Sequence, residues 1–228
     1  MAEKRETLIT HSQTMLGFIL ANNTKPLNVL CLGAHCDDIE IGAGGTLLKL
    51  VNNYPISAVK WGVFASDEIR KKEAILSAER FLEKVDKTDI TVHSYRDAFL
   101  PFCAAEIKEC FETIKREFSP DLIFTHYRDD RHQDHRLVND LTWNTWRNHL
   151  ILEYEIPKYD GDLGIPGFYV TLDESYIAKR NHIILESFAS QRSKHWFDDD
   201  TFRALPRLRG MESATVYAEA FYARKVIF

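Results

Sequence analysis

The chain has 228 residues, of which 45% are hydrophobic and 28% charged, and its formal net charge is −5 at pH 7. This composition is ordinary for a soluble globular protein, and it excludes a disordered, fibrous or low-complexity chain. The mild excess of acidic residues disfavours a general nucleic-acid binder, so no nucleic-acid partner is expected.

The four cysteines form no Cys-x-x-Cys pair, which excludes a zinc ribbon and a thioredoxin-type motif. The N-terminus lacks the pattern of a signal peptide, and no stretch approaches the ~20 apolar residues that span a bilayer. We therefore expect a cytoplasmic protein with reduced thiols and no transmembrane segment.

No repeat or Pro/Gly/Ser-rich linker divides the chain, so a single domain over 1–228 is expected. Residues 5–22 are predicted to form a helix that ends before Pro26, which makes 1–26 an N-terminal helical segment. The apolar run 27–33 then predicts a buried strand of a parallel sheet. A helix from Thr46 to Val51 is expected after a glycine-rich stretch.

Strands and helices alternate from there on. The predicted strands cover 58–65, 89–95 and 121–126, and the predicted helices cover 70–85, 104–118 and 134–150. Alternation of this kind implies parallel βαβ crossovers, and hence a Rossmann-like three-layer α/β/α sandwich with a mostly parallel sheet over 27–150.

The remaining residues, 151–228, are expected to shape the substrate pocket. Strands are predicted over 152–156 and 168–172, with a helix over 173–189. Residues 192–215 follow no recognisable pattern, and the last eighteen residues fit a helix, a strand or both.

Two clusters of polar residues come directly after predicted strands. The first runs from His35 to Glu40 and the second from His126 to His135. Because ligands bind at the carboxyl edge of the strands in open α/β sheets, the two loops can converge in space although they lie far apart in the sequence.

Imidazole and carboxylate are the ligands of catalytic zinc sites, which keep one position open for water. We assign His35, Asp38 and His135 as ligands of a Zn²⁺ ion, although the same donors suit other divalent metals. Asp37 would be the general base, because a metal lowers the pKa of water from ~15.7 to ~7. His132 would act as an acid or stabilise an oxyanion.

Asp134 would accept a hydrogen bond from an imidazole and fix its tautomer. Each cluster alone also has a structural alternative, since a lone His is often structural and an Asp pair at a strand end often caps a helix. A dinucleotide site is disfavoured, because the spacing after Gly33 is not Gly-x-Gly-x-x-Gly and acidic groups would repel a pyrophosphate. The joint occurrence of both clusters at one sheet edge favours the metal site.

Residues 34–45, AHCDDIEIGAGG, resemble the A-H-P-D-D-x-x-x-G-x-G-G signature of the PIG-L/LmbE-like deacetylases. The His-x-Asp-His element at 132–135 resembles the second signature of that family. These enzymes are zinc-dependent hydrolases that remove acetyl groups from N-acetylglucosamine units. The resemblance therefore implies a metal-dependent N-deacetylase whose partner is a small-molecule amino-sugar derivative. By position, the metal ligands, the base and the active-site histidine of the family fall on His35, Asp38, His135, Asp37 and His132.

The resemblance extends to weaker elements. Arg70 and Asp97 match family positions near the substrate, with a salt bridge or a cap as the alternative. Glu219 lies in a closing Tyr-Ala-Glu-x-Phe element and is expected to be structural. Cys36 departs from the family, which has a Pro that stiffens this turn, and a small buried side chain is expected there.

The aromatic residues leave further alternatives open. Trp196 and Phe197 are candidates for stacking on a sugar or aglycone, with packing as the alternative, whereas Trp143 and Trp146 are expected to be packed. The many aromatic side chains also make self-association into a homo-oligomer unsurprising.

Two other functions remain open. One is a different metal-dependent amidase or esterase on the same site, and the other is a non-catalytic sugar-binding module. The intact set of predicted ligands together with a base argues against the module.

Overall fold

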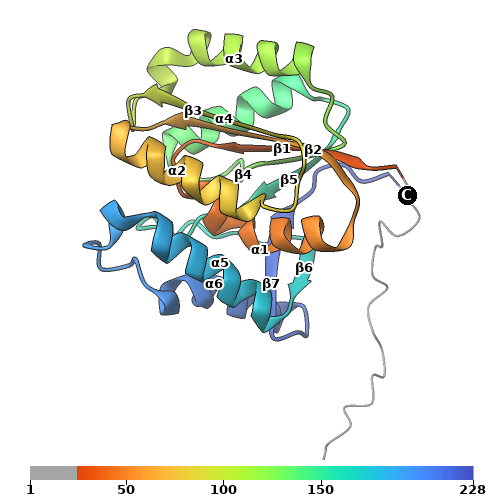
Figure 1. The fold of residues 1–228 in the computed structure, drawn as a ribbon, viewed down its shortest axis with the longest axis vertical. Helices are drawn as coiled ribbons and strands as arrows, with labels where there is room; N and C mark the ends of the chain where they lie inside the picture. The colour runs from red at the N-terminus through yellow and green to blue at the C-terminus, as the bar shows by residue number, and fades with distance from the viewer. Residues whose placement is uncertain (1–24, 228) are drawn as a thin grey trace, which may run out of the picture.

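The computed structural model describes residues 25–227, so the helix expected over 5–22 lies outside the described residues. One seven-stranded sheet runs through the described part of the chain in the order β3-β2-β1-β4-β5-β7-β6 (Figure 1). The strands are β1 (Leu27–Gly33), β2 (Ile56–Ala65), β3 (Thr88–Tyr95), β4 (Leu122–His126), β5 (Leu150–Tyr154), β6 (Phe168–Leu172) and β7 (Tyr217–Tyr222). Strands β1 to β5 pair in parallel, whereas β7 is antiparallel to both β5 and β6. The prediction of a mostly parallel sheet is therefore confirmed.

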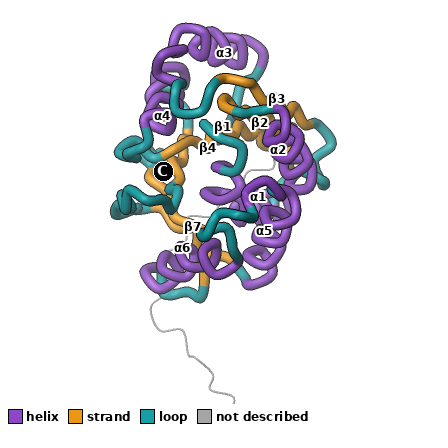
Figure 2. Tube along the Cα trace, turned by 90° about the vertical axis from the view of Figure 1, so that its left-hand side faces the viewer, coloured by secondary structure: helices purple, strands orange, loops and turns teal. Residues whose placement is uncertain are grey.

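Helices cover both faces of this sheet, as Figures 1 and 2 show. α3 (Ala104–Glu117) and α4 (Gln133–Thr145) lie on one face, and α1 (Asp38–Asn53) and α2 (Glu68–Phe81) lie on the other. α5 (Glu174–Ser187) packs against α1 and α2, and α6 (Asp199–Glu212) packs against β7. This arrangement confirms the predicted three-layer α/β/α sandwich. No helix within residues 25–227 is long and apolar enough to cross a membrane.

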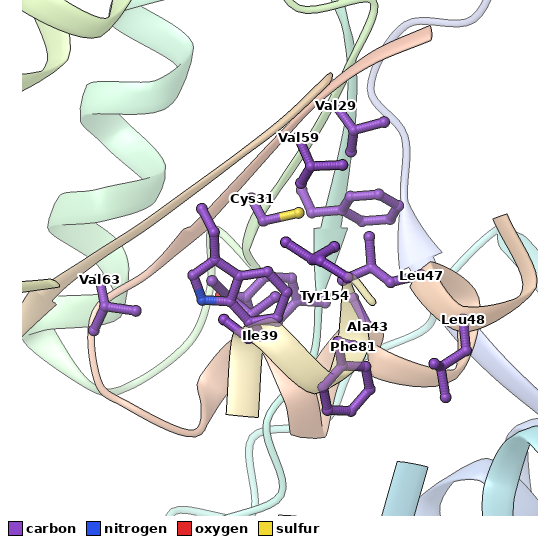
Figure 3. Packing of buried hydrophobic residues seen from close by; sticks show 14 of the residues in the cluster. Val29, Cys31, Ile39, Ala43, Leu47, Leu48, Val59, Val63, Phe81 and Tyr154 are labelled. Atoms are coloured by element: carbon purple, nitrogen blue, oxygen red, sulfur yellow. The ribbon is translucent and has the colours of Figure 1, made fainter. Parts of the chain in front are cut away.

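The two faces of β1 contribute to two separate hydrophobic cores. Val29 and Cys31 pack toward α1 and α2, where Figure 3 shows them with Ala43. Leu30 and Leu32 point to the opposite face, toward α3 and α4. Successive side chains of a strand alternate between faces, so a strand that is covered on both sides needs an unbroken apolar run. This is why 27–33 has the composition of a buried strand.

The glycine-rich stretch lies within a helix and not before one. Helix α1 begins at Asp38 and not at Thr46, so the glycines lie inside it. A Cβ atom at Gly42 would lie 2.3 Å from Tyr154 Cδ2, and one at Gly45 would lie 2.6 Å from Leu172 Cδ1. These glycines therefore permit the close approach of α1 to the sheet.

Several elements beyond β4 differ from the sequence expectation. The helix predicted over 134–150 ends at Thr145, and β5 covers Leu150–Tyr154 instead of 152–156. The pairing of β4 with β5 begins at Leu122 and Leu150, so the chain must leave the helix earlier than its local pattern indicates. Helix α6 (Asp199–Glu212) lies within the stretch 192–215 that showed no pattern, and it contains Pro206.

Glu219 of the C-terminal strand β7 connects helices from distant parts of the chain. Its carboxylate accepts hydrogen bonds from the backbone N–H groups of Gly45 (2.8 Å) and Thr46 (2.7 Å) inside α1. The same carboxylate pairs with the buried Arg180 of α5 at 3.0 Å. Glu219 thus fastens α1 and α5 to β7, in keeping with its expected structural role.

Candidate active site

The two polar clusters meet where the strand order of the sheet reverses. β1 has β2 on one side and β4 on the other, and both are parallel to it. The loop 34–37 leaves β1 and the loop 127–132 leaves β4 at the same carboxyl edge. In doubly wound sheets this switch point forms the crevice in which ligands bind.

Three donor atoms lie close together at this edge, and we call them the donor group: His35 Nδ1, Asp38 Oδ2 and His135 Nε2. His35 Nδ1 lies 3.1 Å from His135 Nε2 and 3.4 Å from Asp38 Oδ2, and His135 Nε2 lies 3.6 Å from Asp38 Oδ2. A tetrahedral metal with ligand bonds of about 2.0–2.2 Å needs donor atoms about 3.3–3.6 Å apart. Two of the three separations fall in this range and the third, between His35 and His135, is slightly shorter, so the predicted ligands lie close to the spacing that a divalent metal requires.

The turn after β1 presents its donors through a local hydrogen bond. Asp38 is the first residue of α1, and its Oδ2 accepts the backbone N–H of His35 at 2.6 Å. This bond closes the turn and brings both side chains to one side. Cys36 is fully buried between them, with its Sγ 3.6 Å from the carbonyl oxygen of Ala65. A small buried side chain thus occupies this position, as expected.

Asp130 orients the third donor, and sequence reasoning did not identify it. Its Oδ2 lies 2.9 Å from His135 Nδ1 and 2.8 Å from Lys158 Nζ, and its Oδ1 accepts the N–H of His132 at 2.7 Å. Burial would raise the pKa of Asp130, but the His135 and Lys158 contacts outweigh it and hold this pKa far below its usual range. An ionised Asp130 keeps the proton of His135 on Nδ1 and leaves Nε2 free for a metal.

His126, the first residue of the second cluster, lies against the predicted ligands. It is fully buried, and its ring stacks on that of His135 with centroids 3.9 Å apart. Its Nε2 accepts the N–H of Ala34 at 2.9 Å and lies 3.2 Å from Asp38 Oδ2. Burial lowers the pKa of His126 to about 4, so this side chain is neutral and packs behind two of the predicted ligands.

Two further carboxylates, those of Asp134 and Asp97, contact Nε2 of His35. Asp134 Oδ2 lies 3.3 Å from His35 Nε2, and Asp97 Oδ1 lies 3.0 Å from it. Burial would lower the pKa of His35, but the carboxylates of Asp38, Asp134 and Asp97 outweigh it and raise this pKa well above its usual value. The cluster therefore favours positive charge at this position, whether a proton or a metal ion. Asp134 contacts an imidazole as predicted, and Asp97 contacts the site through His35.

Asp37 forms an ion pair with a neighbouring cation. Arg70 Nη2 lies 2.9 Å from Asp37 Oδ1, and both side chains are largely buried. The ion pair predicted as the alternative role of Arg70 is therefore present. The Nε group of Arg70 is buried and has no hydrogen-bond partner among residues 25–227.

His132 lies beside the two histidines of the donor group. Its ring lies 4.8 Å from the ring of His35 and 4.7 Å from that of His135, measured between centroids. Its Nδ1 accepts the backbone N–H of Asp134 at 3.2 Å, which places the proton of the neutral ring on Nε2. Burial and the neighbouring imidazoles lower the pKa of His132, which favours this neutral N–H donor form.

Glu40 belongs to the first cluster in sequence but not in space. It is fully buried on α1, and neither carboxyl oxygen has a hydrogen-bond partner within residues 25–227. Burial raises the pKa of Glu40 well above its usual value, so the side chain is neutral and is no metal donor.

The aromatic residues considered for stacking are mostly packed. Phe197 is buried in the core that α1 and α2 share with the sheet, and Trp196 packs against the same core. Trp146 is buried as expected, and Trp143 donates its Nε1–H to Glu153 at 2.7 Å. The packing alternative therefore applies to Trp196 and Phe197.

Comparison with known families identifies one match. A model of the PIG-L family, described as GlcNAc-PI de-N-acetylase, matches residues 30–146. The matched segment begins in β1 and ends just after α4, so it contains both polar clusters and covers about half of the chain.

Several solved structures share the fold. Teicoplanin deacetylase Orf2 in its zinc-inhibited form superposes with a TM-score of 0.70 and 14% identity, covering 86% of this chain and 97% of that one. N,N'-diacetylchitobiose deacetylase from Pyrococcus horikoshii gives 0.65 and 22%, covering 86% and 83%. The 4-carboxy-2-hydroxymuconate hydratase of Pseudomonas putida KT2440 gives 0.68 and 14%, covering 89% and 98%. At these identities the likeness establishes the fold, which serves deacetylases and a hydratase alike.

Proposed function

Because the chain belongs to the PIG-L family of GlcNAc-PI de-N-acetylases, we propose that it is a metal-dependent hydrolase that removes the acetyl group of an N-acetylated amino sugar. The observation that carries this proposal is the mutual distance of 3.1–3.6 Å among the donor atoms of His35, Asp38 and His135. A two-histidine, one-carboxylate set leaves a coordination position open for catalysis.

These three residues would hold the metal, and Zn²⁺ is the metal we expect. When bound, it would supply Lewis acidity that polarises the acetamide carbonyl and makes a nearby water acidic near neutral pH. Asp130 supports the binding by keeping the proton of His135 on Nδ1, away from the donor nitrogen.

The proton transfers are proposed for side chains beside the donor group. Asp37 would take the proton of the attacking water, with its carboxylate oriented by the ion pair to Arg70. The Nε2–H of His132 would donate a hydrogen bond to the oxygen that becomes negative as the acetamide carbonyl is attacked. Protonated Asp37 would then deliver its proton to the leaving amine.

The substrate class rests on the family and on the chemistry of the site. N-acetylglucosamine derivatives are the substrates we expect, and Arg70 and Asp97 are the residues we expect to contact the sugar, since they pair with Asp37 and His35 at the site. The four cysteines are unpaired, which supports the cytoplasmic location expected from the sequence.

The test is acetate release from N-acetylglucosamine and its glycosides by the purified protein, before and after chelation and with metal restored. A simple acetyl ester serves as the comparison substrate. Acetate release from the amides that chelator abolishes and metal restores is the expected result. Hydrolysis of the ester alone would instead identify an esterase, and sugar binding without acetate release would identify a binding module.

A further inference from the structure

The loop between β5 and β6 sends a lysine back to the candidate active site. Lys158 lies in the stretch 155–167, which contains neither helix nor strand, and its Nζ is 2.8 Å from Asp130 Oδ2. The same nitrogen is 2.7 Å from Asp162 Oδ1, and the lysine side chain is only 13% exposed. One ammonium group thus joins two buried carboxylates, one of which contacts the predicted metal ligand His135.

Lys158 and His135 meet at a single oxygen atom. Asp130 Oδ2 lies 2.8 Å from Lys158 Nζ and 2.9 Å from His135 Nδ1, and a carboxylate oxygen can accept both donors at once. The other oxygen, Oδ1, accepts the backbone N–H of His132. Because Nε2 of His135 belongs to the donor group, a displacement of Asp130 Oδ2 would turn the ring that carries this donor.

The loop has other contacts that hold it in place. Asp162 Oδ2 accepts the backbone N–H of Arg131 at 2.6 Å, and Glu155 Oε1 accepts that of Gly164 at 3.0 Å. A buried ion pair adds little net stability, because the desolvation of its charges offsets their attraction. Attachment of the loop is therefore a weak reason for a buried lysine, whereas its contact with Asp130 gives Lys158 a place in the site.

We propose that Lys158 is a positioning residue that fixes Asp130 Oδ2 against His135 Nδ1 and so keeps His135 Nε2 in the donor group. This inference rests on the proposed function and adds a residue of the β5–β6 loop to the site. An ammonium group suits this role because it has three N–H donors. One reaches Asp130, and the others have Asp162 and the carbonyl oxygen of Ile156 (3.4 Å) within reach.

The first test observes the His135 ring directly in metal-free protein labelled with ¹⁵N-histidine. The Nδ1–H proton bonded to Asp130 should give a downfield signal, identified by its loss in His135→Gln. We expect Lys158→Met, which removes the charge but keeps an unbranched side chain, to shift this signal. Asp162→Asn is the matched control, because it changes the other carboxylate that Lys158 contacts and leaves the contact with Asp130 in place. It should leave the signal unchanged.

The double variant Lys158→Met/Asp162→Asn provides the same comparison if Lys158→Met fails to fold, since it leaves one carboxylate fewer without a cation. Its signal should differ from that of Asp162→Asn, which differs from it only at Lys158. In competition with a chelator, we expect both proteins that lack Lys158 to bind Zn²⁺ about tenfold more weakly than Asp162→Asn, because the support of a ligand is lost.

The signal of the metal-free protein requires neither metal nor acetate release, so its outcome is independent of the proposed function. A shifted signal in protein that releases no acetate would uphold the positioning role and count against the deacetylase. An unchanged signal on loss of Lys158 would overturn the inference. The same shift in Asp162→Asn would overturn it as well, since Lys158 would then only fasten the loop.

Discussion

Asp37 and Asp38 are adjacent in the chain but have different surroundings. Asp38 is the first residue of α1, and its Oδ2 lies within 3.6 Å of donor nitrogens of His35 and His135. Asp37 precedes the helix and meets Arg70 at 2.9 Å. Asp38, at the start of the helix, thus contacts the predicted histidine ligands, whereas Asp37, one residue earlier, contacts a cation.

The role proposed for Asp37 can be separated from metal binding. We expect Asp37→Asn to lower kcat by about 10²–10⁴-fold, because an amide cannot take the proton of water. Its metal content should equal that of the wild type, since Asp37 is not one of the three donors. Steady-state kinetics together with elemental analysis measure both quantities. Loss of metal, or wild-type turnover, would refute the assignment of Asp37 as base.

Asp130 shows what the sequence could not reveal at the residue scale. It lies in an acidic pair with Asp129, and nothing local distinguishes the two. In the structure Asp129 is exposed, whereas Asp130 is buried against His135. In the sequence, only its position five residues before His135 relates Asp130 to that ligand, and this spacing alone predicts no contact. The sequence identified donors by their chemistry, but supporting groups such as Asp130 and His126 depend on packing.

Replacing Asp130 tests the support of His135. We expect Asp130→Asn to weaken metal affinity by about 10–100-fold, because the ligand loses the carboxylate that orients it. Competition with a chromophoric chelator gives the affinity. Asp129→Asn is the matched control and should bind as the wild type does. Equal affinities for the two variants would mean that Asp130 does not act through His135.

At the scale of elements, hydrophobic periodicity predicted the alternation of strands and helices up to β4. It failed where tertiary contacts set the boundaries. The glycines of α1 have low helix propensity, yet they lie within a helix because only they permit the contact with Tyr154 and Leu172. Helix α6 was missed because it is strongly charged and contains Pro206.

The close packing of α1 gives a stability prediction. Gly42→Ala should lower the free energy of unfolding by about 1–3 kcal/mol, because the added methyl group would overlap the buried Tyr154 ring. Gly167→Ala is the matched control, since a Cβ atom there meets nothing within 4 Å. Urea denaturation of both variants measures the difference. Equal stability would mean that α1 can move away from β5 without cost.

At the scale of the whole molecule, the order of the strands creates the candidate site. β1 and β4 are neighbours in the sheet, although about 90 residues separate them in the chain. Parallel pairing brings the ends of both strands to one edge, where the donors converge. The alternating pattern allowed this to be predicted. The attachment of β7 to α1 through Glu219 could not be, because that contact joins distant parts of the chain.

The whole molecule also concentrates negative charge at this edge. Asp37, Asp38, Asp97, Asp130 and Asp134 lie around three imidazoles, with Arg70 and Lys158 as the cations in contact. Carboxylates packed this closely repel one another unless positive charge joins them. A divalent metal at the donor group would supply that charge, so metal binding and catalysis should depend on the same ion.

The most direct measurement is a titration of metal-free protein with Zn²⁺, with acetate release from N-acetylglucosamine glycosides recorded at each step. We expect no release without metal, a linear rise, and a break at about one equivalent per chain, as three donors and one open position require. His35→Ala should show no rise over the same range. Acetate release by the metal-free protein, or full activity of His35→Ala, would contradict the central claim that this cluster is a catalytic metal site.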